Sequence, residues 1–292
     1  MSKTITNKSK GLLKNITIVI TGASSGIGKS LSLALAPLKP NLVIVARREN
    51  KLQQTAYHLK KQKIKHISIV GDVRNREDRE SMIKKTLNTF GRIDVLVNNA
   101  GLGKVNLFLE QPEQEIDELI ETNVLSLIKL THSVLPIMKE QEEGHIINLS
   151  STLALLPAYP FAVYCATKSA VKTFSDCIRE EVKEYGIKVS TVLPGPYNTE
   201  FNQVANIGKS DFRGYNVEKL VKKIVKLIMK PKDNLIQPWH FVPVAWLAKI
   251  SERFKNKVTF SIAESILKAK KETSLELENK VEKKEEIKFL TH

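Results

Sequence analysis

The sequence predicts an α/β fold, in which a doubly wound parallel sheet of about seven strands carries helices on both faces. Short apolar runs alternate with longer segments whose apolar residues recur at helical spacing. The runs are β-branched and apolar on both faces, as strands covered on both sides should be. This alternation favours parallel strands joined by right-handed crossovers. In such a sheet, ligands bind at the carboxyl ends of the strands.

Six strands and five helices are predicted in alternation over roughly the first two thirds of the chain. The strands are Ile16–Thr21, Asn41–Ala46, His66–Gly71, Ile93–Asn99, His145–Ser151 and Ile187–Gly195. The helices are Ile27–Leu38, Glu49–Lys61, Arg76–Phe90, Thr122–Glu140 and Phe161–Tyr185.

The regularity fades after residue 195. A further helix is expected over Asn216–Met229, and a seventh strand, at the sheet edge, over Asn234–Pro238. We therefore expect a single domain over residues 14–237 and a C-terminal extension over residues 238–292. The extension holds both tryptophans and a helical pattern, and its mixed-charge tail is expected to fray or to form a solvated helix.

Composition narrows the class of protein. Hydrophobic residues make up 42% of the chain, and no apolar run reaches the roughly 18 residues of a membrane span. The basic, polar N-terminus lacks the apolar block of a signal peptide, so a cytoplasmic location is expected. Cys165 and Cys177 lie too far apart along one predicted helix for a disulfide. Free thiols fit a reducing compartment.

The chain is basic, with a formal net charge of +15 at pH 7. Such a charge could attract nucleic acid, an anionic membrane surface or a phosphorylated cofactor. No RNA-binding or helix-turn-helix signature accompanies it, so we expect no nucleic-acid partner. Most of the lysines are interpreted as a solvated surface.

A glycine-rich turn, TGASSGIG, follows the first predicted strand and opens a helix. Glycines at positions 22, 26 and 28 allow a tight turn and the close approach of a phosphate to the backbone. The free N–H groups at the start of the helix then face that phosphate. A glycine-rich turn alone is weak evidence, but the strand–turn–helix context supports a nucleotide site.

Three motifs together carry a resemblance to a known family. They are the G-x-x-x-G-x-G spacing of Gly22–Gly28, the NNAG of Asn98–Gly101, and Tyr164-x-x-x-Lys168. In this order they resemble the short-chain dehydrogenase/reductase family, from about Lys14 to about Thr199. The resemblance implies a Rossmann-type fold and an oxidoreductase that uses a nicotinamide dinucleotide.

The end of the second strand predicts which dinucleotide binds. An acidic residue there favours NAD, whereas an arginine suits the 2′-phosphate of NADP. Ala46 occupies the expected acidic position, and Arg47 and Arg48 follow it. Guanidinium groups pair with phosphate in a fork. We therefore predict NADP(H), with Arg47 as the better candidate and Ser24 assisting; the alternative is that the arginines only solvate a loop.

Tyr164 and Lys168 are the candidates for proton transfer. A carbonyl that accepts a hydride gains charge on its oxygen and needs a proton donor and a second hydrogen bond. A nearby cation lowers the pKa of a tyrosine, and positions four apart share one helix face. The resemblance adds Ser151, preferred over its neighbour Ser150, as the group that holds the substrate oxygen. It also adds Asn123, which would help to hold a water molecule beside the lysine.

The resemblance implies further cofactor contacts. Asp72 would meet the adenine, unless it only caps the next helix, and Asn99 would lie beside the adenosine ribose. Thr199 would meet the nicotinamide carboxamide, next to the backbone of Tyr197. The complete expected set is Gly22, Ser24, Gly26, Ile27, Gly28, Arg47, Arg48, Asp72, Val73, Asn99, Ala100, Gly101, Tyr164, Lys168, Pro194, Gly195, Tyr197 and Thr199. No metal is expected.

The substrate is less determined. Candidate pocket residues are mostly apolar and favour a keto-acyl, steroid-like or aromatic carbonyl: Leu102, Val105, Leu107, Phe108, Leu153, Leu155, Leu156, Tyr159, Phe161, Phe201 and Phe212. About half of them are expected to be core residues. The predicted function is an NADP(H)-dependent carbonyl reductase or alcohol dehydrogenase. The alternative is a catalytically silent cofactor sensor or a membrane-peripheral protein.

The predicted partners are a small carbonyl or alcohol substrate and further copies of the chain. The resemblance implies a homo-oligomer, a dimer or a tetramer, paired through the Phe161–Tyr185 helix and its neighbour. The extension could cap the substrate cleft, seal an oligomer interface or lie on a membrane. Apolar and basic residues share it, as interfacial helices require.

Overall fold

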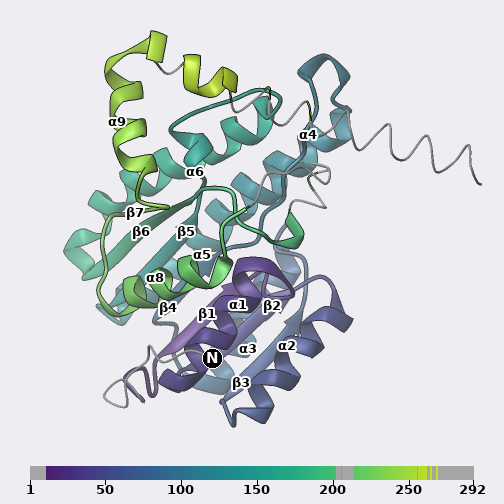
Figure 1. The fold of residues 1–292 in the computed structure, drawn as a ribbon. Helices are drawn as coiled ribbons and strands as arrows, with labels where there is room; N and C mark the ends of the chain where they lie inside the picture. The colour runs from purple at the N-terminus through teal and green to yellow at the C-terminus, as the bar shows by residue number, and fades with distance from the viewer. Residues whose placement is uncertain are drawn as a thin grey trace, which may run out of the picture.

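The computed structural model describes residues 11–201, 205, 214–254, 256–261, 264 and 268. Its centre is a seven-stranded parallel sheet with the strand order β3-β2-β1-β4-β5-β6-β7 (Figure 1). The strands are β1 (Thr17–Thr21), β2 (Asn41–Ala46), β3 (His66–Val70), β4 (Val95–Asn98), β5 (Gly144–Leu149), β6 (Ile187–Pro194) and β7 (Asn234–Gln237). The predicted Rossmann-type, doubly wound fold is confirmed.

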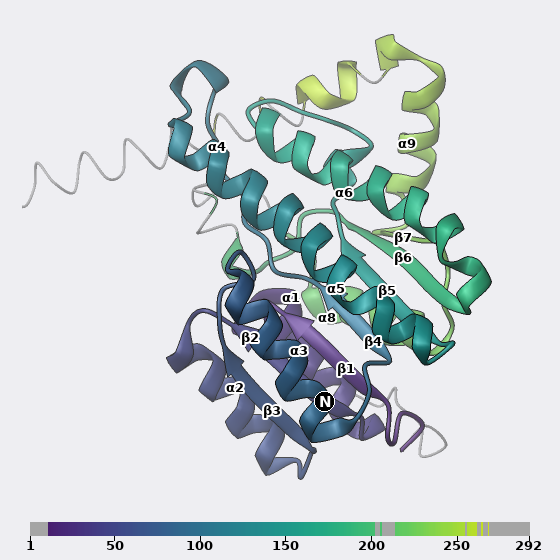
Figure 2. The same cartoon turned by 180° about the vertical axis from the view of Figure 1, so that it is seen from behind.

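Helices cover both faces of the sheet. The helices of the described residues are α1 (Gly26–Leu35), α2 (Glu49–Lys61), α3 (Arg76–Phe90), α4 (Glu113–Ile120), α5 (Ser126–Glu140), α6 (Ala162–Glu181), α8 (Val217–Met229) and α9 (Phe241–Ile250). One buried cluster joins α1, α2 and α8 to the sheet, and a second joins α3, α5 and α6 to it. Figure 2 shows the second layer in front of the strands.

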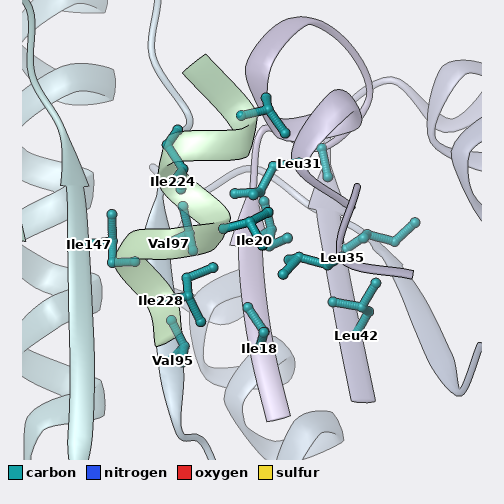
Figure 3. Close-up of a cluster of buried hydrophobic side chains, with 14 of the residues drawn as sticks. Ile18, Ile20, Leu31, Leu35, Leu42, Val95, Val97, Ile147, Ile224 and Ile228 are labelled. Carbon is teal, nitrogen blue, oxygen red and sulfur yellow. The ribbon is translucent and has the colours of Figure 1, made fainter. Parts of the chain in front are cut away.

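The alternation of side chains along each strand builds both clusters. In β1, Ile18 and Ile20 pack with the α1 and α8 layer, whereas Val19 faces the opposite layer. Figure 3 shows Ile18 and Ile20 against Leu31 and Leu35 of α1 and against residues of α8. All three strand residues are fully or almost fully buried. Because both faces of the strand are covered, the sequence had to be apolar on both faces.

Most predicted boundaries lie within two residues of the observed ones, and β2, α2 and α3 match their predictions. The predicted strands at the third to sixth positions run one or two residues too far at their carboxyl ends. Gly71, Asn99, Ser150, Ser151 and Gly195 therefore lie in loops beyond the strands. This difference matters because loop residues at that edge can face a ligand.

The helix predicted over Thr122–Glu140 starts earlier than expected. Helix α4 begins at Glu113, a π-helical turn η4 follows over Glu121–Leu125, and α5 continues from Ser126. Pro112 precedes the first turn, with its carbonyl accepting from the N–H groups of Glu115 and Ile116. The prediction missed α4 because the π turn shifts the apolar period between the two helices.

His145 is a buried polar residue of β5 that belongs to neither apolar cluster. Its Nε2 lies 2.8 Å from Ser190 Oγ on β6, and its Nδ1 has no hydrogen-bond partner among the described residues. Burial lowers its pKa from 6.5 to about 4. The ring is therefore neutral at physiological pH.

The chain beyond β7 is described in part. Helix α9 lies within the predicted extension, and the division of the chain at residues 237 and 238 stays a prediction. The tail beyond residue 268, predicted to fray or to form a solvated helix, lies outside the described residues. Within the described part of the chain, no helix is long and apolar enough to cross a membrane.

Candidate active site

The loops at the carboxyl ends of the strands border a cavity of about 620 Å³. Seventeen of the eighteen residues predicted to contact the cofactor line it; the exception is Gly28. Ser151 lines it too, whereas Asn123 does not. The structure therefore brings together residues that are up to 177 positions apart, from Gly22 to Thr199.

The glycine turn between β1 and α1 forms one wall of this cavity. Gly22 and Gly26 have φ values of 67° and 53°, a conformation that L side chains rarely adopt. A Cβ atom at Gly28 would lie 2.5 Å from the carbonyl oxygen of Gly22, so the turn closes too tightly for a side chain. Asn99 Nδ2 donates to the carbonyl oxygens of Thr21, at 2.8 Å, and Gly22, at 3.2 Å.

The start of α1 suits an anion. Ser25, its N-cap residue, makes no capping hydrogen bond with its side chain, and the first turn contains no acidic residue. The first N–H groups of a helix lack partners within the helix and attract negative charge. Together with the tight glycine turn, this end of the cavity fits a dinucleotide phosphate.

Arg48 crosses the cavity rim beside this turn. Its Nη2 donates to Ser25 Oγ at 2.6 Å and to Ser24 Oγ at 3.3 Å. Its Nη1 pairs with Glu200 at 3.0 Å, and Lys51 pairs with the same carboxylate oxygen at 2.8 Å. Hydrogen bonds from Lys51 and Arg48 hold the pKa of Glu200 below its usual value. Two cations and two hydroxyl groups thus converge at the end of β2.

Arg47 points to a different partner from Arg48. Its Nη1 lies 3.6 Å from Asp72 Oδ2. Arg74 approaches Asp72 more closely, with Nη2 at 2.7 Å and Nε at 3.0 Å from the same carboxylate oxygen. Burial alone would raise the pKa of Asp72, but the bonds from Arg74 and the charge of Arg47 hold it below its usual value. Asp72 is therefore ionised and braced at the cavity edge.

Tyr164, Ser151 and Lys168 meet at the inner end of the cavity. All three are buried, at 7%, 6% and 6% exposure, and all line the cavity. The tyrosine and the lysine lie one turn apart on α6, and Lys168 Nζ is 5.7 Å from the centre of the Tyr164 ring. Ser151, at the start of the short η5 helix (Thr152–Ala154), lies close enough to Tyr164 for its hydroxyl group to act on the pKa of the phenol.

The expectation that Lys168 lowers the pKa of Tyr164 is wrong for this geometry. Burial raises the pKa of Tyr164, and the hydroxyl group of Ser151 offsets only part of that rise. Lys168 Nζ instead donates to the carbonyl oxygen of Leu149 at 3.0 Å. Burial lowers the pKa of Lys168 from 10.5 to about 8. Desolvation sets the direction of both pKa shifts because both groups are buried.

Asn123 lies behind Lys168, in the π-helical turn η4. Its Oδ1 accepts from the N–H of Leu102 at 2.9 Å, and its Nδ2 donates to the carbonyl oxygen of Leu102 at 2.9 Å and to Thr167 Oγ1 at 3.1 Å. A Cβ atom on Gly101 would lie 3.1 Å from Asn123 Oδ1 and 3.4 Å from Lys168 Nζ. Asn123 therefore joins the NNAG loop to α6 beside the lysine.

The two serines at the end of β5 differ in position. Ser150 Oγ donates to the carbonyl oxygen of Lys168 at 2.7 Å, so its hydroxyl group is engaged in tying the loop to α6. Ser151 Oγ accepts from the N–H of Leu153 at 3.1 Å, so its own O–H can still donate, and this hydroxyl group acts on the pKa of Tyr164. This geometry favours Ser151 over Ser150 as the residue that holds a substrate oxygen.

The rest of the cavity wall near Tyr164 is apolar. Leu102, Leu153, Phe161 and Phe201 line it, as predicted. The Phe201 ring lies 5.7 Å from the Tyr164 ring, centre to centre. Other candidates differ: Val105 and Leu156 are core residues, and Leu107, Phe108 and Tyr159 are exposed. Leu155 is half-buried away from the cavity, and Phe212 lies outside the described residues.

Several residues of the site were not predicted, among them Ser25, Lys51, Arg74, Glu200 and Phe241. Arg74 and Glu200 carry no motif, since their roles depend on charged partners that only the fold brings near. Phe241 did leave a signal, because it opens the apolar segment for which capping of the cleft is one of the three roles considered from the sequence. It lines the cavity from α9.

Comparison with known proteins identifies the family of this chain. The family model described as short chain dehydrogenase matches residues 16–209. An uncharacterized oxidoreductase of Staphylococcus saprophyticus is 34% identical over 219 residues, which are 73% of this chain and 86% of the relative.

Solved structures agree in fold. A short-chain dehydrogenase from Sphingobium yanoikuyae, in complex with NADPH, is 30% identical with a TM-score of 0.74, covering 82% of this chain and 93% of the other. A short-chain dehydrogenase/reductase from Burkholderia phymatum, in complex with NAD, has a TM-score of 0.77 at 20% identity, covering 84% and 96%.

The fold and these comparisons define an oxidoreductase with a Rossmann-type sheet. The chain belongs to the short-chain dehydrogenase/reductase family.

Proposed function

We propose that this protein is an NADP(H)-dependent carbonyl reductase or alcohol dehydrogenase for an apolar substrate. The observation that carries the proposal is the meeting of Ser151, Tyr164 and Lys168 in one cavity with Arg48 and the glycine turn. A cofactor sensor without chemistry has no need of the first three groups. Their joint presence argues against that alternative.

The cofactor would be held along the strand ends. The glycine turn and the start of α1 would bind its phosphates, and Asp72 would receive the adenine. Thr199 would meet the nicotinamide; its side chain lies 3.4 Å from where a Cβ atom on Gly26 would stand. When bound, the nicotinamide supplies or accepts the hydride.

Tyr164 would transfer the proton to or from the substrate oxygen. Burial raises its pKa, so the phenol keeps its proton and can donate it to an oxygen that gains negative charge. Ser151 would give the second hydrogen bond to that oxygen, which stabilises the developing charge. Lys168 would restore the proton to Tyr164. Asn123 would hold the NNAG loop and α6 in place beside Lys168.

Arg48 supports the choice of NADP(H). Its guanidinium and the hydroxyl groups of Ser24 and Ser25 form the kind of donor set that suits a phosphate monoester. Lys51 adds a second cation nearby. We expected Arg47 to be the better candidate, but the geometry favours Arg48. The NADPH complex of the Sphingobium yanoikuyae structure is consistent with this preference.

The cavity wall supports an apolar carbonyl compound. Leu102, Leu153, Phe161 and Phe201 surround the space beside Tyr164, and none of them can pair with a charged group on the substrate. The homo-oligomer and the cytoplasmic location remain predictions.

A carbonyl panel tests the proposal. We expect absorbance at 340 nm to fall when the protein, NADPH and an aromatic or long-chain ketone or aldehyde are mixed, with a lower Michaelis constant for NADPH than for NADH. Failure to turn over any apolar carbonyl or its alcohol, although the dinucleotide binds, would sink the enzymatic assignment. A lower Michaelis constant for NADH would refute the NADP preference alone.

A further inference from the structure

Helix α9 is apolar on two opposite sides. Ala245 and Ala248 are buried against the protein, at 5% and 6% exposure. Val242, Trp246 and Ile250 recur every four residues on another side and are exposed, at 46%, 62% and 66%. A surface helix normally presents polar residues to water on the side away from the core. This helix presents a second apolar stripe there.

Two more residues extend the exposed stripe. Leu247 is 43% exposed and Trp239, just before the helix, is 72% exposed. We call Trp239, Val242, Trp246, Leu247 and Ile250 the outer face of α9. It contains both tryptophans of the chain. Contiguous exposed apolar residues of this size mark a surface that binds something.

The position of α9 leaves this face open. Figures 1 and 2 show the helix beyond the β7 edge of the sheet, beside α6 and away from α1, α2 and α3. Its amino end alone reaches the cavity, through Phe241. The helix therefore borders the substrate space at one end and presents apolar side chains outward along its length.

Charge indicates which partner fits. Arg253 and Lys257 are exposed in the segment that follows α9, with Glu252 as the acidic residue among them. The whole chain carries a formal net charge of +15. Tryptophans combined with flanking cations are typical of helices that lie in the headgroup region of an anionic bilayer. A water-soluble protein partner of opposite charge would be matched by polar residues, which the outer face lacks.

We propose that the outer face of α9 lies on an anionic lipid surface, with the helix parallel to the membrane plane. Trp239 and Trp246 would insert among the headgroups, and Arg253 and Lys257 would meet the lipid phosphates. The cavity mouth at Phe241 would then lie close to the membrane, where apolar carbonyl compounds concentrate. The lipid contact itself does not depend on the proposed function.

Vesicle flotation of the full chain tests the proposal. We expect the protein to float with vesicles of phosphatidylglycerol and phosphatidylcholine, to bind pure phosphatidylcholine at least tenfold more weakly, and to show a blue-shifted tryptophan emission on binding. Raising the salt concentration should weaken binding. Wild-type protein that stays in solution with the anionic vesicles would overturn the proposal.

A double variant and a matched control locate the contact. Trp246→Glu/Ile250→Glu should lose at least nine tenths of the flotation, whereas Leu109→Glu, at a fully exposed leucine remote from α9, should float normally. Unchanged circular dichroism would show that both variants fold. Flotation of the double variant at the wild-type level would refute the assignment. So would a concentration-dependent dimer that this variant abolishes without lipid, because the face would then join two copies.

Discussion

The two ends of the cavity are held in place by different means. At the proposed cofactor end, the backbone sets the geometry: Gly22 and Gly26 turn with positive φ, and Asn99 ties that turn to the end of β4. At the proposed substrate end, side chains set the geometry, as the Phe201 ring packs against Tyr164 and Phe241 lines the cavity from α9. Backbone constraints demand particular residues at particular spacings, whereas an apolar wall accepts many.

Removing the phenol should have the largest effect. Tyr164→Phe deletes the proton donor and keeps the ring, so we expect turnover to fall about 10²- to 10⁴-fold. Dinucleotide binding should change little, and fluorescence titration with NADPH would check this. Tyr159→Phe is the matched control, because that tyrosine is exposed and outside the cavity. Turnover retained by the first variant would remove Tyr164 from the mechanism.

Filling the glycine turn should be nearly as severe for cofactor binding. Gly28→Ala places a Cβ atom 2.5 Å from the Gly22 carbonyl oxygen, so the backbone must shift. We expect NADPH affinity to fall at least tenfold and stability to fall by about 1–3 kcal/mol. In Gly91→Ala the Cβ atom has free space, although φ is 75°. The Gly91→Ala control should lose stability without losing NADPH affinity. If both variants bound NADPH equally well, the assignment of the glycine turn to the cofactor site would be contradicted.

Arg48→Ala tests the phosphate end. Loss of a charge-assisted hydrogen bond of about 1.5–3 kcal/mol should raise the Michaelis constant for NADPH roughly tenfold to hundredfold. The value for NADH should stay the same. Arg47→Ala should matter less, since Arg47 faces Asp72. A larger effect of Arg47→Ala would restore the expectation formed from the sequence.

His145→Gln tests a buried residue of the sheet that lies outside the cavity. The folded pKa of about 4 lies below the ordinary 6.5, so the unfolded chain binds the proton first as the pH falls. The free energy of unfolding therefore has its full value above pH 6.5. It decreases by about 3 kcal/mol as the pH falls from 6.5 to 4. Urea unfolding at several pH values should show that the free energy of unfolding of His145→Gln does not fall over this pH range. The control His58→Gln, at an exposed position, should show the same fall as the wild type. Identical pH profiles of wild type and His145→Gln would contradict the assignment.

Glu200→Gln should have the smallest effect of these variants, and it should strengthen NADPH binding, whereas Gly28→Ala and Arg48→Ala should weaken it. The carboxylate pairs with Arg48 and Lys51, which are the cations proposed for the 2′-phosphate. Removing its charge should raise NADPH affinity about twofold to fivefold, within the range of an exposed ion pair. NADH affinity should not change. Weaker binding of both dinucleotides would show that Glu200 instead braces the loop after β6.

The sequence was sufficient for the sheet, the glycine turn and the tyrosine–lysine pair, because each is defined by local spacing. Arg74 and Glu200 escaped prediction since their partners lie on other elements, and side-chain direction decided between Arg47 and Arg48. Burial, which only the folded chain defines, reversed the expected direction of the Tyr164 pKa. The apolar character of the cavity wall was predictable from the sequence. The sequence did not distinguish the core residues Val105 and Leu156 from the residues that line the cavity.

The π-helical turn at Glu121–Leu125 has a consequence for evolution of this chain. Such a turn holds one residue more than an α-helical turn would. Deleting a single residue there would convert it to regular α-helix and change the directions in which the side chains of this turn point. Asn123 would then swing away from Leu102 and Thr167, although no motif in the sequence would look disturbed. The number of residues between Glu113 and Glu140 should therefore be as strongly constrained as the identity of any side chain.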